Sequence, residues 1–203
     1  MTRRALKILL PIQAKSTGWF IGIYALIVTI LITIFTATNT EETLSFWMSD
    51  SIRYTINIYL LIMGIVYPLT STKLYVLQGL TRKQFFWAYT GAMSIISLFL
   101  LIPIIVSFSY FGNSVSLLTV LTEYLYMPLY FLTGWICAVG FQLKKWYTSI
   151  LGLISALAIF NGITIATEAF NLSEPAVFAL VVVLLAAVLL ILPRVISRIP
   201  LKS

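Results

Sequence analysis

Residues 175–192 read PAVFALVVVLLAAVLLIL, an unbroken run without a charged or hydrogen-bonding side chain. An α-helix rises 1.5 Å per residue, so about 20 such residues cross the ~30 Å hydrocarbon core of a bilayer. Five further apolar runs of comparable length occupy 18–37, 54–74, 86–110, 124–143 and 146–167. The sequence therefore predicts an all-α, polytopic membrane protein, with six spanning helices in a single transmembrane domain over residues 1–203.

The composition of the chain supports this class. Hydrophobic residues make up 61% of the 203 residues and charged residues only 9%, whereas a soluble domain is roughly half apolar and about a quarter charged. A folded chain of this size cannot bury so much apolar surface inside itself. We therefore expect lipid to cover much of that surface.

The basic residues predict the orientation of the helices. Arg53 lies on one side of the membrane together with all six acidic residues. The other twelve basic residues lie before the first run, after the sixth, or in the second-to-third and fourth-to-fifth connections: Arg3, Arg4, Lys7, Lys15, Lys73, Arg82, Lys83, Lys144, Lys145, Arg194, Arg198 and Lys202. Because basic loops stay in the cytoplasm, we expect both termini to be cytoplasmic.

Residues 2–17 differ from the six runs because basic residues alternate there with apolar ones. This segment is too short and too charged to span, so we expect an amphipathic helix in the cytoplasmic headgroup layer, kinked or interrupted at Pro11. A disordered basic tail is the alternative. No small-residue cleavage site follows the first run, so we expect that run to be a retained helix and not a signal peptide.

Several kinds of chemistry are disfavoured by what the sequence lacks. It contains no histidine and a single cysteine, Cys137, so neither a metal site nor a histidine general base is expected. No Walker A motif and no nucleic-acid-binding motif occurs. We therefore expect no catalytic residue, metal or cofactor in this chain, and no nucleic-acid partner.

Charged residues are also missing from the middle of the predicted spans, where ion-coupled transporters usually keep them. Ion-coupled transport is therefore disfavoured, although backbone carbonyls and asparagine can hold sodium. Polar side chains inside the spans, such as that of Gln142, more often bond to a neighbouring helix than to a ligand. The candidate residues for a substrate path are Asn57, Tyr67, Tyr130 and Asn161.

Pairs of small residues four positions apart occur in three of the runs. They are Gly18 and Gly22, Gly134 and Ala138, and Ala158 and Gly162. This spacing lets helix backbones approach closely, either within the chain or between two copies of it.

The segment between the second and third runs, 73–86, carries the strongest functional pattern. It reads KLYVLQGLTRKQFF, which is too long for a tight turn and too apolar for a solvated loop. Gly79 can end a first helical stretch with a positive φ, and Thr81 is suited to the N-cap of the next helix. We therefore predict a short cytoplasmic helix, a glycine turn and a second helix entering the membrane.

Within this segment, Gly79-Leu80-Thr81-Arg82-Lys83-Gln84-Phe85-Phe86 resembles the Gly-x-[Ser/Thr]-Arg-x-x-[Phe] signature of type-2 ABC transporter permeases. Elsewhere the chain is similar to that family in architecture: a basic interfacial N-terminal helix, six spans and both ends inside. One difference is the short outer segment 168–174, where many members of the family have re-entrant helices.

The resemblance implies that 73–86 is a coupling segment, which docks in a groove of a separate ATPase and transmits its nucleotide-driven motion. Gly79 would form the turn, Arg82 would contact acidic residues of the ATPase, and two phenylalanines would anchor the contact. The residues carried over in this way are Leu77, Gly79, Thr81, Arg82, Lys83, Phe85 and Phe86. The alternative is that the basic residues here only mark the cytoplasmic side.

We therefore expect the membrane subunit of an ATP-driven exporter, with ATP and Mg²⁺ bound by the partner ATPase. Two permeases would pair, as a homodimer or with a related chain, in a cell membrane that the resemblance suggests is bacterial and cytoplasmic. The uncharged, tyrosine-rich spans favour an amphipathic or lipophilic substrate such as a peptide, lipid or drug. The alternatives are a non-transporting membrane protein, such as an immunity or assembly factor, and an ion-coupled secondary transporter.

Overall fold

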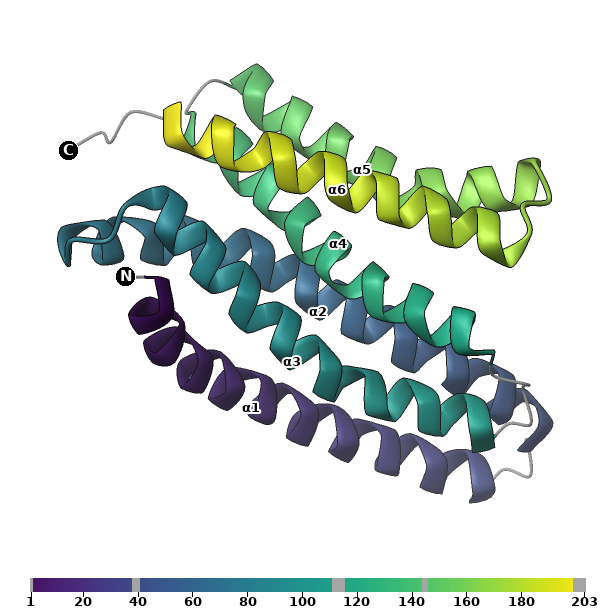
Figure 1. Ribbon diagram of the computed structural model, residues 1–203. Helices are drawn as coiled ribbons and strands as arrows, with labels where there is room; N and C mark the ends of the chain where they lie inside the picture. Colours follow the sequence, from purple (N-terminus) through teal and green to yellow (C-terminus); the bar gives the residue numbers. More distant parts are fainter. Residues whose placement is uncertain (1, 38–40, 111–115, 144–145, 199–203) are drawn as a thin grey trace.

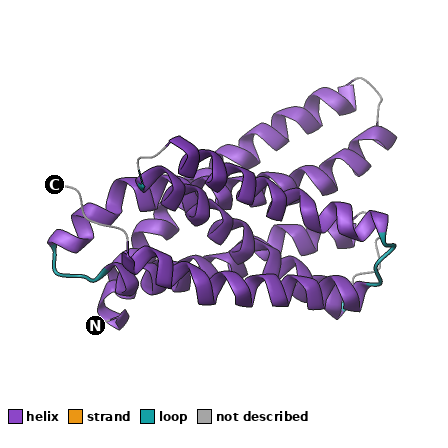
Figure 2. Ribbon diagram, turned by 90° about the horizontal axis from the view of Figure 1, so that it is seen from above, coloured by secondary structure: helices purple, strands orange, loops and turns teal. Residues whose placement is uncertain are grey.

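The computed structural model describes residues 2–37, 41–110, 116–143 and 146–198. These ranges contain six helices (Figure 1), namely α1 Thr2–Ala37, α2 Glu41–Leu77, α3 Arg82–Tyr110, α4 Leu117–Gln142, α5 Trp146–Ala169 and α6 Glu174–Arg198. The same ranges contain no strand (Figure 2). Each helix is long and apolar enough to cross a membrane, so the predicted all-α fold with six candidate spans is confirmed.

The helices form a bundle with α4 at its centre. α4 packs against α2, α3, α5 and α6, and Figure 1 shows it between the α5–α6 pair and the α2–α3 pair, with α1 outermost. Consecutive helices run in opposite directions. The start of α1, the turn between α2 and α3 and the end of α6 therefore lie at one end of the bundle, here named the basic end.

The basic end carries the residues that the sequence assigns to the cytoplasm. Lys7, Lys15, Lys73 and Lys83 are exposed there, and so is Arg194. Lys144, Lys145 and Lys202, which belong to the same predicted set, lie outside the described residues.

The apolar runs predict how many helices there are, but they do not predict accurately where each helix begins and ends. α2 begins at Glu41 and not at 54, so most of the expected outer loop is helical, and α4 begins at Leu117 and not at 124. α6 continues to Arg198, beyond the expected end at 192. An apolar run stops where side chains become polar, whereas backbone hydrogen bonding continues until a cap or a turn ends the helix.

The expected interruption at Pro11 is wrong, because α1 continues from Thr2 to Ala37. Residues 2–17 are thus the first part of α1 and not a separate helix. Four buried residues at every fourth position form one stripe along this part: Ala5, Leu9, Gln13 and Thr17. Pro11 lies on the exposed face, so packing of the opposite face holds the helix together despite the lost hydrogen bond.

Specific contacts attach this stripe to the bundle. The hydroxyl oxygens of Thr17 and Tyr59 lie 2.9 Å apart, and the ring of Phe20 stacks on that of Tyr59 with centroids 4.0 Å apart. The side chain of Leu6 reaches Gly91, where a Cβ atom would lie 3.0 Å from the Leu6 Cδ1 atom. The amphipathic pattern that suggested a membrane-surface helix therefore places one face of α1 against α2 and α3.

Glycines set the distance between the central helices. A Cβ atom added at Gly64 in α2 or at Gly134 in α4 would overlap the backbone of the other helix. The pairing of Gly134 with a neighbouring helix agrees with the close approach that its spacing to Ala138 predicts. By contrast, Gly18, Gly22 and Gly162 have no atom within 4 Å of an added Cβ, so those two motifs do not mediate packing inside this chain.

The connection between α5 and α6 is short, as the sequence predicts. It comprises residues 170–173, with Asn171 at a φ of 45°. The Leu172 amide donates to the Thr167 carbonyl at 3.1 Å, which closes the end of α5 in the manner of a left-handed helix cap. The described backbone contains no re-entrant helix between α5 and α6.

Candidate functional site

The turn between α2 and α3 joins two capped helix ends. α2 continues through Leu77 and α3 begins at Arg82, so only residues 78–81 lie between them. The predicted short helix within 73–86 is therefore wrong: its first residues are the last turn of α2, and the connection is a tight turn. Gly79 permits this because its φ is 88°, a conformation that other residues adopt only with strain.

Backbone and side-chain hydrogen bonds fix both ends of this turn. The amide of Gly79 donates to the Val76 carbonyl at 3.0 Å, and that of Leu80 to the Tyr75 carbonyl at 3.1 Å, the two bonds of a Schellman cap. At the start of α3, the Gln84 amide donates to Thr81 Oγ1 at 3.2 Å and the Thr81 amide to Gln84 Oε1 at 3.1 Å. This capping box confirms Thr81 as the N-cap.

The expected partner-binding residues of the turn divide into two groups. Leu77 is 79% exposed, and Gly79, Thr81 and Lys83 are also exposed, while Arg82 is half-buried. Phe85 and Phe86 are fully buried. Their burial does not agree with the predicted role as anchors on a partner protein, because other residues of this chain already cover both rings.

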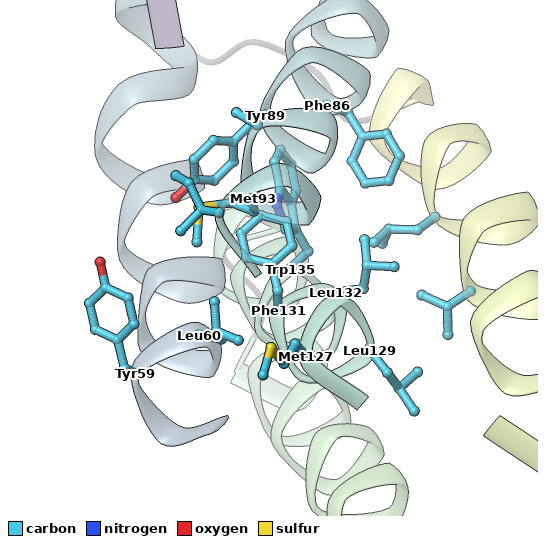
Figure 3. Packing of buried hydrophobic residues seen from close by; sticks show 14 of the residues in the cluster. Tyr59, Leu60, Phe86, Tyr89, Met93, Met127, Leu129, Phe131, Leu132 and Trp135 are labelled. Carbon is cyan, nitrogen blue, oxygen red and sulfur yellow. The ribbon is translucent and has the colours of Figure 1, made fainter. Parts of the chain in front are cut away.

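The buried phenylalanines belong to an aromatic cluster that joins α2, α3 and α4 just inside the turn. Its members are Tyr67, Tyr75, Phe85, Phe86, Tyr89, Phe131 and Trp135. The ring centroid of Phe86 lies 5.1 Å from that of Trp135, and the two rings meet edge to face. Figure 3 shows Phe86 and Tyr89 on α3 with Trp135 of α4 between them. These ring contacts hold the start of α3 against α4.

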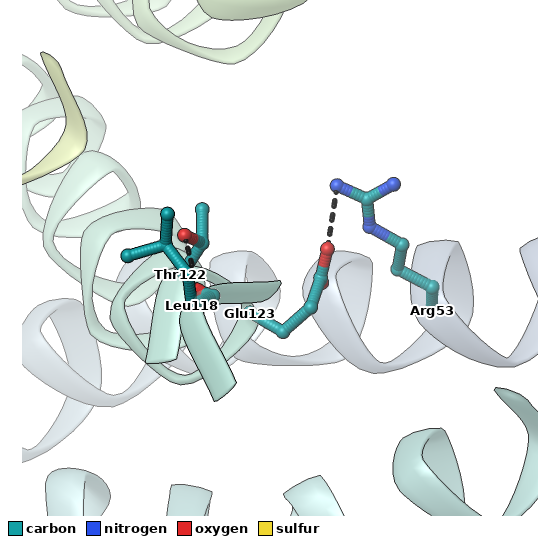
Figure 4. A network of polar contacts seen from close by, with 4 residues as sticks. All are labelled: Arg53, Leu118, Thr122 and Glu123. Atoms are coloured by element: carbon teal, nitrogen blue, oxygen red, sulfur yellow. Dashed lines mark hydrogen bonds and ion pairs between the residues drawn. The ribbon is translucent and has the colours of Figure 1, made fainter. Parts of the chain in front are cut away.

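A charged pair joins α2 and α4 near the opposite end of the bundle. Arg53 Nη2 lies 2.9 Å from Glu123 Oε1, with side chains 32% and 7% exposed, respectively. Figure 4 shows the two side chains reaching toward each other from their helices. The guanidinium of Arg53 also lies 5.4 Å from the ring centroid of Tyr126, a cation–π distance.

Sequence reasoning did not find this pair. Arg53 is the only basic residue predicted on the outer side of the membrane, and Glu123 immediately precedes the fourth predicted run on that same side. That shared level in the membrane is the signal that could have linked them. A charge that is costly to bury is retained where an opposite charge meets it.

A cavity of about 320 Å³ opens beside the charged pair. Its walls come from α2, α4, α5 and α6 and include the polar residues Arg53, Tyr54, Asn57, Thr119, Thr122, Glu123, Tyr126, Tyr130, Thr167 and Glu174. Leu172 and Val177 add apolar wall. The lining thus combines both signs of charge with hydroxyl groups and aliphatic surface, which suits an amphipathic ligand.

The cavity brings together two of the four residues expected along a substrate path. Asn57 and Tyr130 line it, and the buried Asn57 Oδ1 atom has no hydrogen-bond partner among the described residues. Tyr67 belongs instead to the aromatic cluster, with its hydroxyl 3.0 Å from that of Tyr75. Asn161 is exposed on α5 and donates to the Leu157 carbonyl at 3.2 Å, so it is not part of the cavity.

Comparisons of this chain with protein-family models, with curated proteins and with solved structures found no match.

Proposed function

We propose that this chain is the membrane-spanning permease subunit of an ATP-driven exporter that works with a separate ATPase. The observation that carries the proposal is the turn between α2 and α3. It presents Leu74, Leu77 and Lys83 outward, while the aromatic cluster fixes it to α4. A partner that displaced this turn would displace α2, α3 and α4 as one body, because their packing leaves little room for independent motion.

The energy source lies outside this chain in the proposal. The sequence has no Walker A motif, so ATP and Mg²⁺ bind to the ATPase subunit. The turn lies at the basic end, which the positive-inside rule places in the cytoplasm, where an ATPase has access to nucleotide. The membrane is a cell membrane, and the family resemblance favours a bacterial cytoplasmic membrane.

The cavity beside Arg53 and Glu123 is the candidate substrate path. The cavity lies near the end of α2 and α4 that is opposite to the turn. The helices that would receive motion from the ATPase therefore also line the cavity. Its mixed lining supports an amphipathic substrate such as a peptide, lipid or drug. A second permease, identical or related, completes the transporter.

A pull-down from the native host tests the partner. The tagged chain is purified in mild detergent, and co-purifying proteins are identified by mass spectrometry, with Leu77→Asp compared to wild type. Leu117→Asp is the matched control, because Leu117 is equally exposed, at 79%, but begins α4 at the opposite end. An ATPase that is recovered with wild type and with the control, and is lost with Leu77→Asp, supports the proposal.

Recovery of the wild-type chain without any ATPase would remove the transporter proposal. Equal recovery of an ATPase with both variants would keep the partner but move its contact away from the turn.

One observation favours a second candidate, ion-coupled transport. Glu123 is a buried carboxylate that lines the cavity together with Asn57, whose buried Oδ1 atom has no hydrogen-bond partner among the described residues, and such groups can bind a cation. Transport by reconstituted protein that follows an imposed sodium or proton gradient without ATP would identify this function.

A further inference from the structure

A second cavity, of about 220 Å³, lies at the basic end between the start of α3 and the last turns of α6. It is separate from the charged pair and lies beside the turn, with which it shares Lys83. The residues that line it are Lys83, Trp87, Leu189, Leu190, Pro193, Arg194 and Ser197.

Two basic side chains from distant parts of the sequence meet at this groove. Lys83 comes from the first turn of α3 and Arg194 from the last turns of α6, and both are exposed. Among the described residues, no carboxylate pairs with either of them. The ion pair found in this part of the chain, between Arg53 and Glu123, lies near the other end of the bundle. The groove therefore concentrates positive charge that is free to bind an anion.

The walls of the groove are apolar. Leu189, Leu190 and Trp87 line it, and Leu190 and Trp87 are 62% and 41% exposed. Exposed apolar side chains also occur further along both helices, such as Phe99 in α3 and Val183 in α6. A tryptophan beside basic residues is typical of the level of lipid headgroups.

We propose that this groove binds a phospholipid with an anionic headgroup. Lys83 and Arg194 contact the phosphate, and Trp87 and Leu190 contact the first carbons of the acyl chains. Arginine suits this role because its planar guanidinium can donate two hydrogen bonds to one phosphate. A soluble phosphate compound would use the two charges but would leave the apolar walls uncovered, which favours a lipid as the occupant.

The function of the groove does not depend on an ATPase or on transport. A bound lipid would link the start of α3 to the end of α6, two helices that have few other contacts with each other.

Native mass spectrometry of the purified chain tests this proposal. Phosphatidylglycerol and phosphatidylcholine are titrated separately into wild type, into K83Q/R194Q and into K15Q/K73Q. The last variant is the matched control, because it removes the same charge from exposed residues at the same end but outside the groove. We expect phosphatidylglycerol to bind wild type and the control alike, and K83Q/R194Q at least about tenfold more weakly, since charge-assisted hydrogen bonds are lost.

Two further measurements serve as controls for charge and for folding. K83R/R194K retains both charges and should restore binding, and the melting temperature of each variant in detergent checks that it is folded. Equal binding of phosphatidylcholine to wild type, or equal loss in the control, would overturn the proposal. So would tight binding of inorganic phosphate that competes with phosphatidylglycerol, because the occupant would then be a soluble anion.

Discussion

Gly64 of α2 and Gly134 of α4 lie back to back in the centre of the bundle. A Cβ atom built on Gly134 would lie 2.8 Å from the Gly64 Cα atom, and one built on Gly64 would lie 3.1 Å from the Gly134 Cα atom. The two helices therefore meet through backbone atoms. Backbone atoms cannot move aside as a flexible side chain can, so this contact tolerates no added volume.

Gly134→Ala should destabilise the protein, because the new methyl group forces α2 and α4 apart. We expect a loss of about 3 kcal/mol, at the upper end of the range for overpacked cores. Gly162→Ala in α5 is the control, since nothing lies within 4 Å of its added Cβ. Thermal unfolding in detergent measures both, and equal melting temperatures for the two variants would contradict this packing.

Glu123→Gln should lower stability by leaving the Arg53 guanidinium without its carboxylate. The expected loss is about 1–2 kcal/mol, less than for a fully buried pair because Arg53 is partly exposed. The double variant R53Q/E123Q should lose less than the sum of the two single variants, since neither charge is then left unpaired. Additive losses in chemical unfolding would mean that the two side chains do not interact.

Phe86→Ala should reduce stability and leave the surface of the turn unchanged. The Phe86 ring is fully buried, and removing such a ring typically costs about 3–5 kcal/mol in a protein core. Leu77→Ala is the comparison, because its side chain is exposed and its loss should leave the melting temperature unchanged. A stable Phe86→Ala protein would show that the ring is not part of the core.

Gly79→Ala should strain the turn between α2 and α3. A residue with a Cβ atom at a φ of 88° costs about 1–2 kcal/mol. Gly79→Asn should cost less, because asparagine tolerates positive φ better than alanine. Hydrogen exchange at the amides of the turn, measured for both variants, should rise more with alanine; the reverse order would point to a different backbone geometry.

Sequence reasoning succeeds where one physical rule decides the outcome. Length and hydropathy predict six helices, and the helix rules for glycine and threonine predict the turn at Gly79 and the N-cap at Thr81. The same reasoning fails where the outcome depends on which neighbour covers a side chain. Phe86 and Phe99 are equally hydrophobic, yet Phe86 is fully buried and Phe99 is 64% exposed. Hydropathy measures only removal from water, so it does not separate lipid contact from protein contact.

The candidate sites show the same limit. The segment 73–86 was found from its composition, but the inward direction of Phe85 and Phe86 depends on the position of Trp135, about fifty residues further along the chain. Likewise, the pairing of Arg53 with Glu123 requires α2 and α4 to be neighbours, which no local pattern encodes. Local rules gave the turn and its caps, and tertiary contacts decided what those elements touch.

The four-residue connection between α5 and α6 also bears on how this protein enters the bilayer during biosynthesis. Residues 170–173 contain no charged side chain, so the only charges that cross the membrane with this tip are those of Glu168 and Glu174, which flank it. Two apolar helices joined this tightly can enter as one hairpin, with their backbone groups already hydrogen-bonded within each helix. The last two helices would then need no separate translocation step, and α6 would reach its place beside α4 together with α5.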